Sequence, residues 1–194
     1  MFWKGSLAVG LFTACMAGLS ACAVNEPAQA ASGDPAPMRA ELLLAALEDA
    51  EAATKAQDGA RLDKALRTIA MLGAKPLTSH DEQRLASWRA ASAGDEGDLR
   101  GRTLGPAFRS GSVAAGGSAI IEQTFYGGTP ASVSLRVPEG SPLRLRVIDK
   151  SNRRVCEQSA RKVMCRWLPL YTQSHRIELV NERATNARYY LVFD

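Results

Sequence analysis

The stretch "ASVSLRVPEGSPLRLRVID", residues 131–149, decides the fold class of the second half of this 194-residue chain. Apolar residues occupy every second position in 133–137 and again in 143–147, with Glu139-Gly140 between the two runs. A period of two is typical of strands that bury one face. The stretch therefore predicts two half-buried strands separated by a turn.

Similar short segments fill the rest of the chain from residue 104 onward. Turn residues such as Gly127-Gly128 and Ser151-Asn152 separate them. The further predicted strands are 118–125, 154–157, 163–167, 176–181 and 188–193. About seven strands with no helical segment between them predict an antiparallel β-sandwich over residues 104–194.

The segment 38–93 has the composition and period of three short helices. The chain around Leu43 is rich in Ala, Leu and Glu, and the next apolar face ends at Gly73, which predicts a helix C-terminus there. Ser79 and Glu82, three residues apart, predict a capping box for the third helix. We expect a small bundle or helical hairpin before the sandwich, so the predicted fold class is α+β with helices and strands segregated.

The N-terminal segment is predicted to be a targeting signal for export. Lys4 is followed by an apolar or small run from residue 5 to 19, which is shorter than the roughly 20 residues that a transmembrane helix needs. A run of this length is typical of a secretory signal peptide. It ends in Leu19-Ser20-Ala21-Cys22, which resembles the lipobox of bacterial lipoproteins. The resemblance implies a signal peptide over 1–21, a lipid on Cys22, and an outer-membrane protein facing the periplasm.

Two other processing sites remain open at this point. Phe12-Thr13-Ala14-Cys15 is a second, poorer match to the lipobox, and Ala28-Gln29-Ala30 fits a cleavage site for ordinary secretion. An uncleaved anchor is a third possibility. Residues 22–37 are rich in Ala, Pro, Ser and Gly, which predicts a flexible tether, and polar residues 94–103 predict a linker.

Export determines how we interpret Cys156 and Cys165, which lie nine positions apart. The two other cysteines are consumed with the signal peptide or the anchor, and two thiols in an oxidising compartment normally pair. A zinc site needs closer spacing and four ligands, and a redox pair is usually C-x-x-C. We expect a disulfide that ties a hairpin, with Glu157 opposite Met164.

The segments "SLRV", "PLRLRVID", "CRWLP", "RIELVNE" and "ARYYLVF", between residues 134 and 193, together resemble bacterial pre-peptidase C-terminal (PPC)-like β-sandwich domains. The resemblance covers roughly residues 104–194 and implies a non-catalytic appendage that binds, shields or assists export. Family members often have aspartates where this chain has Arg144 and Arg146, so the resemblance implies no calcium site here.

Charge is distributed unevenly along the chain. Residues 22–98 contain 8 Lys/Arg against 13 Asp/Glu, a net of −5, whereas residues 99–194 contain 15 against 7, a net of +8. Basic residues gather around the cysteine pair, next to an aromatic side chain: Arg153, Arg154, Arg161, Lys162, Arg166 and Trp167. They either protect a sheet edge from unwanted pairing or contact an anionic envelope component or an acidic protein partner. The expected compartment excludes nucleic acid.

No sequence motif indicates catalysis. Residues 159–162 match S-x-x-K but lack its partner motifs, and 79–81 name Ser, His and Asp as sequence neighbours, which is not how a triad is built. Neither His80 nor His175 has the spacing of a metal ligand. We therefore expect a non-catalytic binding or scaffold protein without metal or cofactor.

The alternative is an enzyme, or an enzyme accessory, that acts on cell-wall or glycan material. It would use carboxylates alone, and Glu122, Asp149 and Glu178 are the residues that the fold would have to bring together. A purely structural spacer is a weaker third hypothesis.

Overall fold

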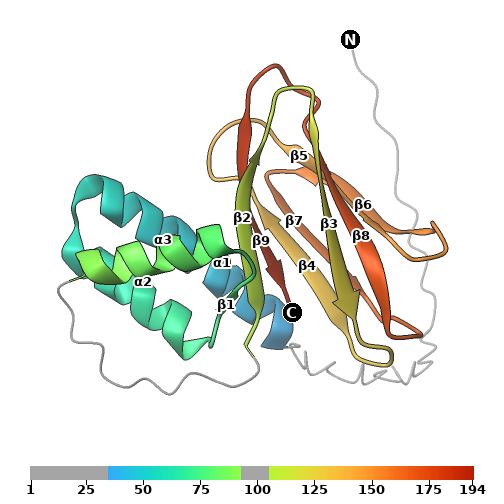
Figure 1. Ribbon diagram of the computed structural model, residues 1–194, viewed down its shortest axis with the longest axis horizontal. Helices are drawn as coiled ribbons and strands as arrows, with labels where there is room; N and C mark the ends of the chain where they lie inside the picture. The colour runs from blue at the N-terminus through green and yellow to red at the C-terminus, as the bar shows by residue number, and fades with distance from the viewer. Residues whose placement is uncertain (1–34, 93–104) are drawn as a thin grey trace, which may run out of the picture. The chain divides into compact units, whose positions relative to one another are not determined.

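The computed structural model describes residues 35–92 and 105–194 (Figure 1). The predicted signal peptide, the alternative processing sites, Cys22 and the linker 94–103 lie outside these residues. Three helices come first, α1 (Pro35–Ala56), α2 (Gly59–Met71) and α3 (Ser79–Ala91), with the two-residue strand β1 (Lys75–Pro76) before α3. Two sheets follow, which confirms the predicted α+β class with segregated helices and strands.

The helix ends follow local side-chain chemistry. Asp58 accepts a hydrogen bond from the backbone N–H of Arg61 (3.0 Å) at the start of α2. After α2, Gly73 takes a φ of 63°, as expected of a glycine just past a helix end. The predicted cap of α3 is wrong by one residue: the side chain of Thr78, not of Ser79, accepts from the backbone N–H of Asp81 (3.2 Å).

The sandwich has eight strands: β2 (Ala107–Val113), β3 (Ser118–Phe125), β4 (Ala131–Arg136), β5 (Leu143–Ile148), β6 (Arg154–Ala160), β7 (Lys162–Trp167), β8 (Gln173–Val180) and β9 (Ala187–Phe193). One sheet has the order β1-β2-β9-β4-β7 and the other β3-β8-β5-β6. Every pairing among the described strands is antiparallel except β1 with β2. The alternation in residues 131–149 places Val133 and Leu135 of one sheet in a single core with Leu145 and Val147 of the other.

Strand β2 was not predicted from the sequence. Its residues, "AFRSGSV", contain a glycine and show little apolar character. A Cβ at Gly111 would lie 2.7 Å from the hydroxyl oxygen of Tyr189 on the neighbouring strand β9, so any other residue there would displace the Tyr189 ring. The Tyr189 ring over position 111 therefore favours glycine there, and this glycine makes the segment difficult to recognise as a strand from its sequence.

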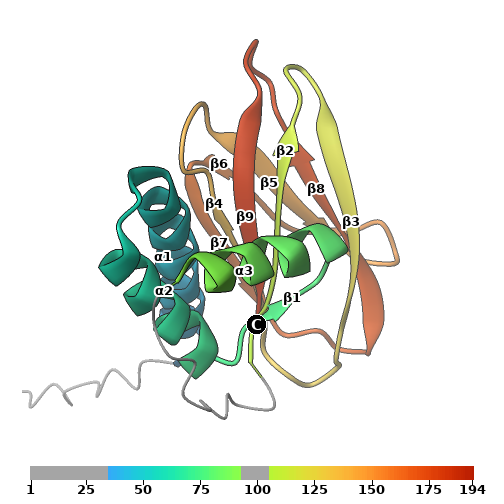
Figure 2. The ribbon, with the colours of Figure 1, turned by 60° about the vertical axis from the view of Figure 1, so that its left-hand side comes forward.

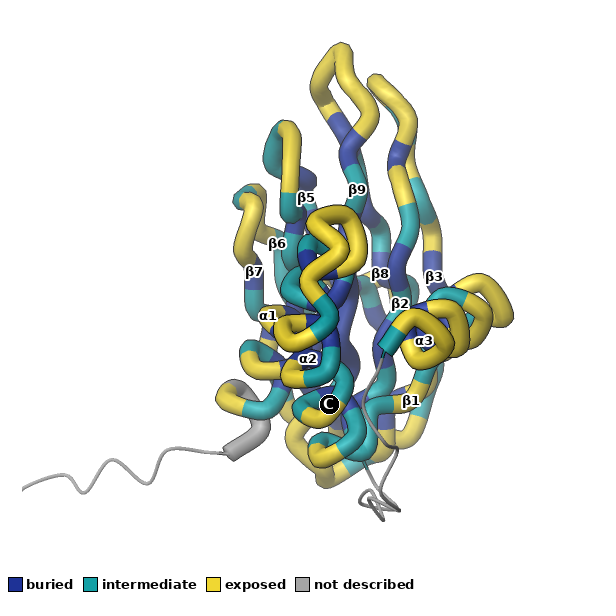
Figure 3. Tube along the Cα trace, turned by 90° about the vertical axis from the view of Figure 1, so that its left-hand side faces the viewer, coloured by how far each residue is buried: buried dark blue, intermediate teal, exposed yellow. Residues whose placement is uncertain are grey.

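The helices cover the outer face of the five-stranded sheet (Figures 1 and 2). Leu43 and Leu47 of α1 share a second core with Phe108 of β2 and with Tyr190 and Val192 of β9. Strand β9 is therefore buried on both faces, as the colouring by burial shows (Figure 3). Both cores lie within Asp34–Asp194, which forms one compact unit.

Ion pairs join α1 to this sheet. Arg136 of β4 donates to the carboxylates of Glu41 and Glu48, at 2.8 Å each. The alternate positions of Arg136, Arg144 and Arg146 in residues 131–149 predict that all three lie on a solvated face; for Arg136 this is wrong because α1 covers it. Arg144 and Arg146 do lie on an outer face, that of the four-stranded sheet, where they pair with glutamates.

The disulfide between Cys156 and Cys165 is confirmed, with 5.9 Å between the Cα atoms. The predicted hairpin is wrong. Strand β6 pairs with β5 and places Glu157 opposite Arg146, whereas β7 pairs with β4 in the other sheet and places Met164 opposite Ser134. The chain crosses between the sheets at Arg161, so the disulfide joins the edge strand of one sheet to the edge strand of the other.

Candidate binding surface

Three loops meet at one end of the sandwich, and we call this region the loop end. They are residues 126–130 between β3 and β4, 149–153 between β5 and β6, and 168–172 between β7 and β8. The strand register brings them together, because Phe125 pairs with Gln173, Trp167 with Ala131, and Ile148 with Arg176.

Two of these loops hold each other in place. The backbone N–H of Gly128 donates to the carbonyl of Pro169 (2.8 Å), and the N–H of Gly127 donates to the hydroxyl of Thr172 (3.0 Å). A Cβ at residue 127 would lie 2.8 Å from the Cα of Tyr171, so only glycine allows the loops to approach this closely.

The same two loops carry exposed apolar side chains. Tyr126 is 72% exposed, Leu168 58%, Leu170 74% and Tyr171 74%. No sequence pattern above singled out these residues, although the run "LPLYT" at 168–172 places apolar residues in a turn between strands. Four large apolar side chains that protrude from one pair of mutually fixed loops form a candidate contact surface.

The third loop is built around Asp149. Its carboxylate accepts hydrogen bonds from the backbone N–H groups of Ser151 and Arg153, both at 2.9 Å, and from Nε of Arg153 at 2.8 Å. These interactions, with the backbone bond from Arg153 as the largest, outweigh desolvation and lower the pKa of Asp149. Its side chain is only 3% exposed, so Asp149 acts as a turn former rather than as a free acid.

We expect Asp149→Asn to destabilise the fold at neutral pH. Because the pKa of this carboxyl is lower in the folded chain than its ordinary value of 3.8, the charge stabilises the fold above that pH, and the contribution is lost as the pH falls through the folded pKa. Urea unfolding from pH 7 down to pH 3 should therefore show a difference between the two chains that shrinks in acid. Glu139→Gln, at an exposed position, is the control, and an Asp149→Asn effect of equal size at all pH values would contradict this account.

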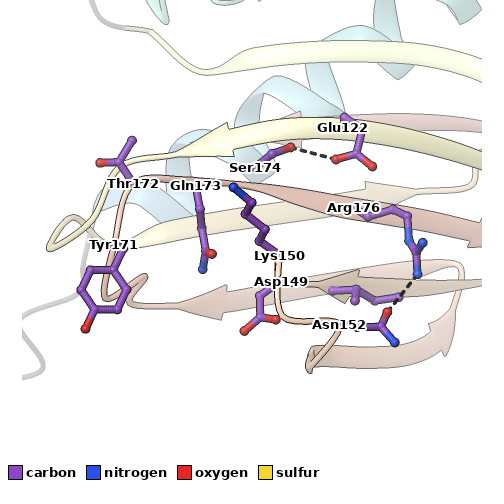
Figure 4. A pocket seen from close by; sticks show the side chains of 10 residues that line it. Glu122, Asp149, Lys150, Asn152, Tyr171, Thr172, Gln173, Ser174 and Arg176 are labelled. Carbon is purple, nitrogen blue, oxygen red and sulfur yellow. Dashed lines mark hydrogen bonds between the residues drawn. The ribbon is translucent and has the colours of Figure 1, made fainter.

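A shallow pocket of about 520 Å³ lies beside this loop (Figure 4). Its wall combines charged and polar groups, including Glu122, Lys150 and Arg176, with the ring of Tyr171. Glu122 accepts a hydrogen bond from the hydroxyl of Ser174 (2.8 Å). The pocket is thus lined mainly by polar groups that already have partners or face solvent.

The three carboxylates of the glycan-hydrolase alternative do not all meet. Glu122 and Asp149 line the same pocket, but Glu178 does not. Glu178 instead pairs with Arg176 (3.0 Å) and lies 3.8 Å from a guanidinium nitrogen of Arg146.

A second pocket, of about 220 Å³, is lined by residues that include Trp167, Leu168, Tyr171 and Arg153. The Trp167 ring packs edge-on against Phe125, with 4.7 Å between the centroids, and its indole Nε1 is buried without a hydrogen-bond partner. His175 is 1% exposed and closes the aromatic cluster beneath the pocket.

The basic residues singled out in the sequence do not form one cluster. Arg153 pairs with Asp149, and Arg154 pairs with Glu157, whose pKa is lowered by Arg154 first and then by Arg146. Arg166 precedes Trp167 at the loop-end terminus of β7.

Arg161 and Lys162 lie at the far terminus of β7. There the guanidinium of Arg161 donates to the carbonyls of Val137 and Pro138, and Lys162 pairs with Glu41 of α1 (3.1 Å). The basic residues and Trp167 therefore fall into two groups: Arg161 and Lys162 lie at one end of β7, and the other four lie toward the loop end.

The two matches to catalytic motifs are separate in the fold. Ser159 and Lys162 of the S-x-x-K match lie on different strands. Asp81 of the Ser-His-Asp run is buried, where it accepts hydrogen bonds from the backbone N–H of Ser110 (3.1 Å) and from the Ser110 hydroxyl. Among the described residues, no group of three or more His, Cys, Asp and Glu side chains is placed to hold a metal ion. Within the same residues, no helix combines the length and the apolar character needed to span a membrane.

No protein-family model and no curated protein matches the chain. Among solved structures it is similar to a mitogen derived from Yersinia pseudotuberculosis, with 15% identity, a TM-score of 0.39, and coverage of 45% of this chain and 83% of that one. It is also similar to the pre-peptidase C-terminal domain of a Bacillus anthracis collagenase, with 11% identity and a TM-score of 0.38. That match covers 45% of this chain and 87% of the collagenase domain. A third similar structure is the Aeromonas hydrophila protein PliG, a periplasmic inhibitor of g-type lysozyme, with 10% identity and a TM-score of 0.38. That match covers 46% of this chain and 84% of PliG. At TM-scores this low, the three structures are no guide to what this chain binds.

Proposed function

We propose that this chain is a non-catalytic binding protein of the bacterial cell envelope, held to a membrane by a lipid on Cys22. The observation that carries the proposal is the loop end, where four large apolar side chains are each more than half exposed. Apolar side chains gathered in this way mark interaction sites. The lipobox-like sequence before Cys22 and the disulfide support an envelope location, because disulfides persist outside the reducing cytosol.

The chemistry of the pocket supports binding rather than hydrolysis. A glycan hydrolase needs a carboxylic acid whose raised pKa lets it donate a proton. Asp149 has the opposite shift, and its oxygens accept three hydrogen bonds within its own turn. Glu178, the third candidate carboxylate, lies outside the pocket and pairs with an arginine.

The experiment uses the full chain in intact cells. A photo-activatable phenylalanine analogue is placed at Leu168 or, as the control, at Ile120 on the four-stranded sheet, since both side chains are 58% exposed. We expect adducts from position 168 in several-fold excess over position 120, because only the first lies in the proposed contact surface. Mass spectrometry identifies what is attached.

The same cells test the anchor. We expect Cys22→Ser to move the protein from the membrane fraction to the soluble fraction, and globomycin to make the precursor of the unaltered chain accumulate. Equal adduct yields at the two positions would contradict the binding surface. A Cys22→Ser chain that stays in the membrane fraction after a high-salt wash, with no precursor of the unaltered chain accumulating under globomycin, would contradict the lipid.

A further inference from the structure

We infer that the loop end docks on an anionic phospholipid surface. The inference rests on the proposed function and names the partner of the same site. Its first support is the chemistry of the exposed side chains. Leu168 and Leu170 are aliphatic, whereas Tyr126 and Tyr171 combine an apolar ring with a polar hydroxyl, a pairing that suits the boundary between acyl chains and headgroups.

Charge is the second support. The three loops contain a single carboxylate, that of Asp149, and this side chain is 3% exposed and paired with Arg153. The exposed charges in the same loops are cationic: Lys150 is exposed, and the Arg153 side chain is 73% exposed. Arg154, at the start of β6, has a side chain that is 65% exposed. The three loops, with Lys150 and Arg153 against Asp149, carry a net charge of +1, and a basic rim around apolar loops is attracted to anionic headgroups. The exposed Glu122 of β3 lies in the pocket beside Lys150 and is the opposing charge.

The third support is the point at which the chain joins the fold. Arg39, in the second turn of α1, pairs with the C-terminal residue Asp194 (2.8 Å). Asp194 in turn exchanges backbone hydrogen bonds with Ser132, two residues beyond the loop 126–130. The start of α1 is therefore at the loop end.

This position limits how far the loop end can be from a lipidated Cys22. Twelve residues lie between Cys22 and Pro35, and this stretch of chain reaches at most about 45 Å when fully extended. A membrane that holds Cys22 is thus within reach of the loop end. Met38, 68% exposed in the first turns of α1, adds a further apolar side chain near the same end.

Vesicle binding tests the inference on residues 34–194, the compact unit that contains both cores, so that neither the lipid nor the apolar N-terminal run contributes. The probe is sedimentation with vesicles of phosphatidylethanolamine and phosphatidylglycerol, against vesicles of phosphatidylcholine alone. We expect binding to the anionic vesicles that weakens with added salt. Leu168→Ser/Leu170→Ser should weaken it by about tenfold or more, because two apolar side chains no longer insert. Ile120→Ser, the matched control, should bind as the unaltered chain does.

Charge reversal separates the electrostatic support from the apolar one. Lys150→Glu should weaken binding to the anionic vesicles several-fold and leave the phosphatidylcholine result unchanged. Circular dichroism and an intact disulfide establish that each variant is folded. The inference is overturned if the unaltered chain binds neither vesicle type, or if the Leu168→Ser/Leu170→Ser variant binds as well as the Ile120→Ser control.

The two proposals fail in different ways. A protein adduct at position 168 in cells, with no vesicle binding, would reject the phospholipid partner and leave the binding surface in place. Vesicle binding by the isolated unit, with no precursor accumulating under globomycin, would reject the lipid anchor instead.

Discussion

Replacing Phe108 with alanine is expected to lower the free energy of unfolding by about 3–5 kcal/mol. Phe108 is 2% exposed and stands on β2 in the second core, where it packs with α1 residues such as Leu43 and with Tyr190 of β9. Its removal leaves a cavity between the helices and the sheet, because the surrounding side chains relax only partially.

Urea unfolding measures the loss, followed by circular dichroism for the helices and by tryptophan fluorescence for the packing of Trp88 and Trp167. Both probes should report one transition, since the helices and the sandwich share the residues of β9. Met71→Ala, at a side chain that is 60% exposed, should change the free energy by less than about 0.5 kcal/mol. Separate helix and sheet transitions in the unaltered chain would contradict a shared core.

Cys156→Ala/Cys165→Ala is expected to lower the free energy of unfolding by about 2.5–3 kcal/mol, the chain-entropy effect of opening a loop of this size. The loss of the disulfide should act mainly at one edge of the sandwich. The bond joins edge strands β6 and β7 of opposite sheets, so its loss frees the edge of the sandwich while the two sheets keep their other contacts.

Denaturation with and without dithiothreitol provides the measurement. The reductant should lower the unfolding midpoint of the unaltered chain to that of the double variant, and it should leave the variant itself unchanged. An unaltered midpoint that does not respond to reductant, under conditions where thiol titration finds both cysteines free, would show that the covalent link contributes nothing to stability.

Much of the architecture could be predicted because its signals are local. The alternation around Val133 and Leu145 reports burial of one face, and a glycine such as Gly73 reports a helix end; each requires only neighbouring residues. The cysteine pairing was predictable too, since the predicted export would leave only Cys156 and Cys165 to pair.

What failed depends on contacts distant in sequence. The predicted strands 154–157 and 163–167, with a short polar segment between them, resemble a hairpin, and nothing local shows that β6 and β7 belong to different sheets. Arg136 alternates with apolar residues as a solvated side chain would, but its partners Glu41 and Glu48 come from a helix some ninety positions away. The strand β2 could not be predicted because it contains Gly111, which is favoured there by the Tyr189 ring some eighty residues later in the chain.

The candidate site was missed for a related reason. Basic residues are conspicuous in the sequence, yet the fold divides them between the two ends of β7 and pairs several with glutamates or carbonyls. Leu168 and Leu170 read as ordinary strand-flanking apolar residues, and only the fold shows that they point away from both cores. Exposure is a property of the assembled chain, so no local pattern predicted it.

Everything proposed about this molecule depends on whether its protruding apolar loops are in contact with something in the living cell. The yield of light-induced adducts at Leu168, divided by the yield at the equally exposed Ile120, measures this most directly. A ratio of several-fold, with phospholipid as the attached species, is the predicted result. A ratio near one would mean that these loops face only water, and neither the binding surface nor its membrane partner would survive.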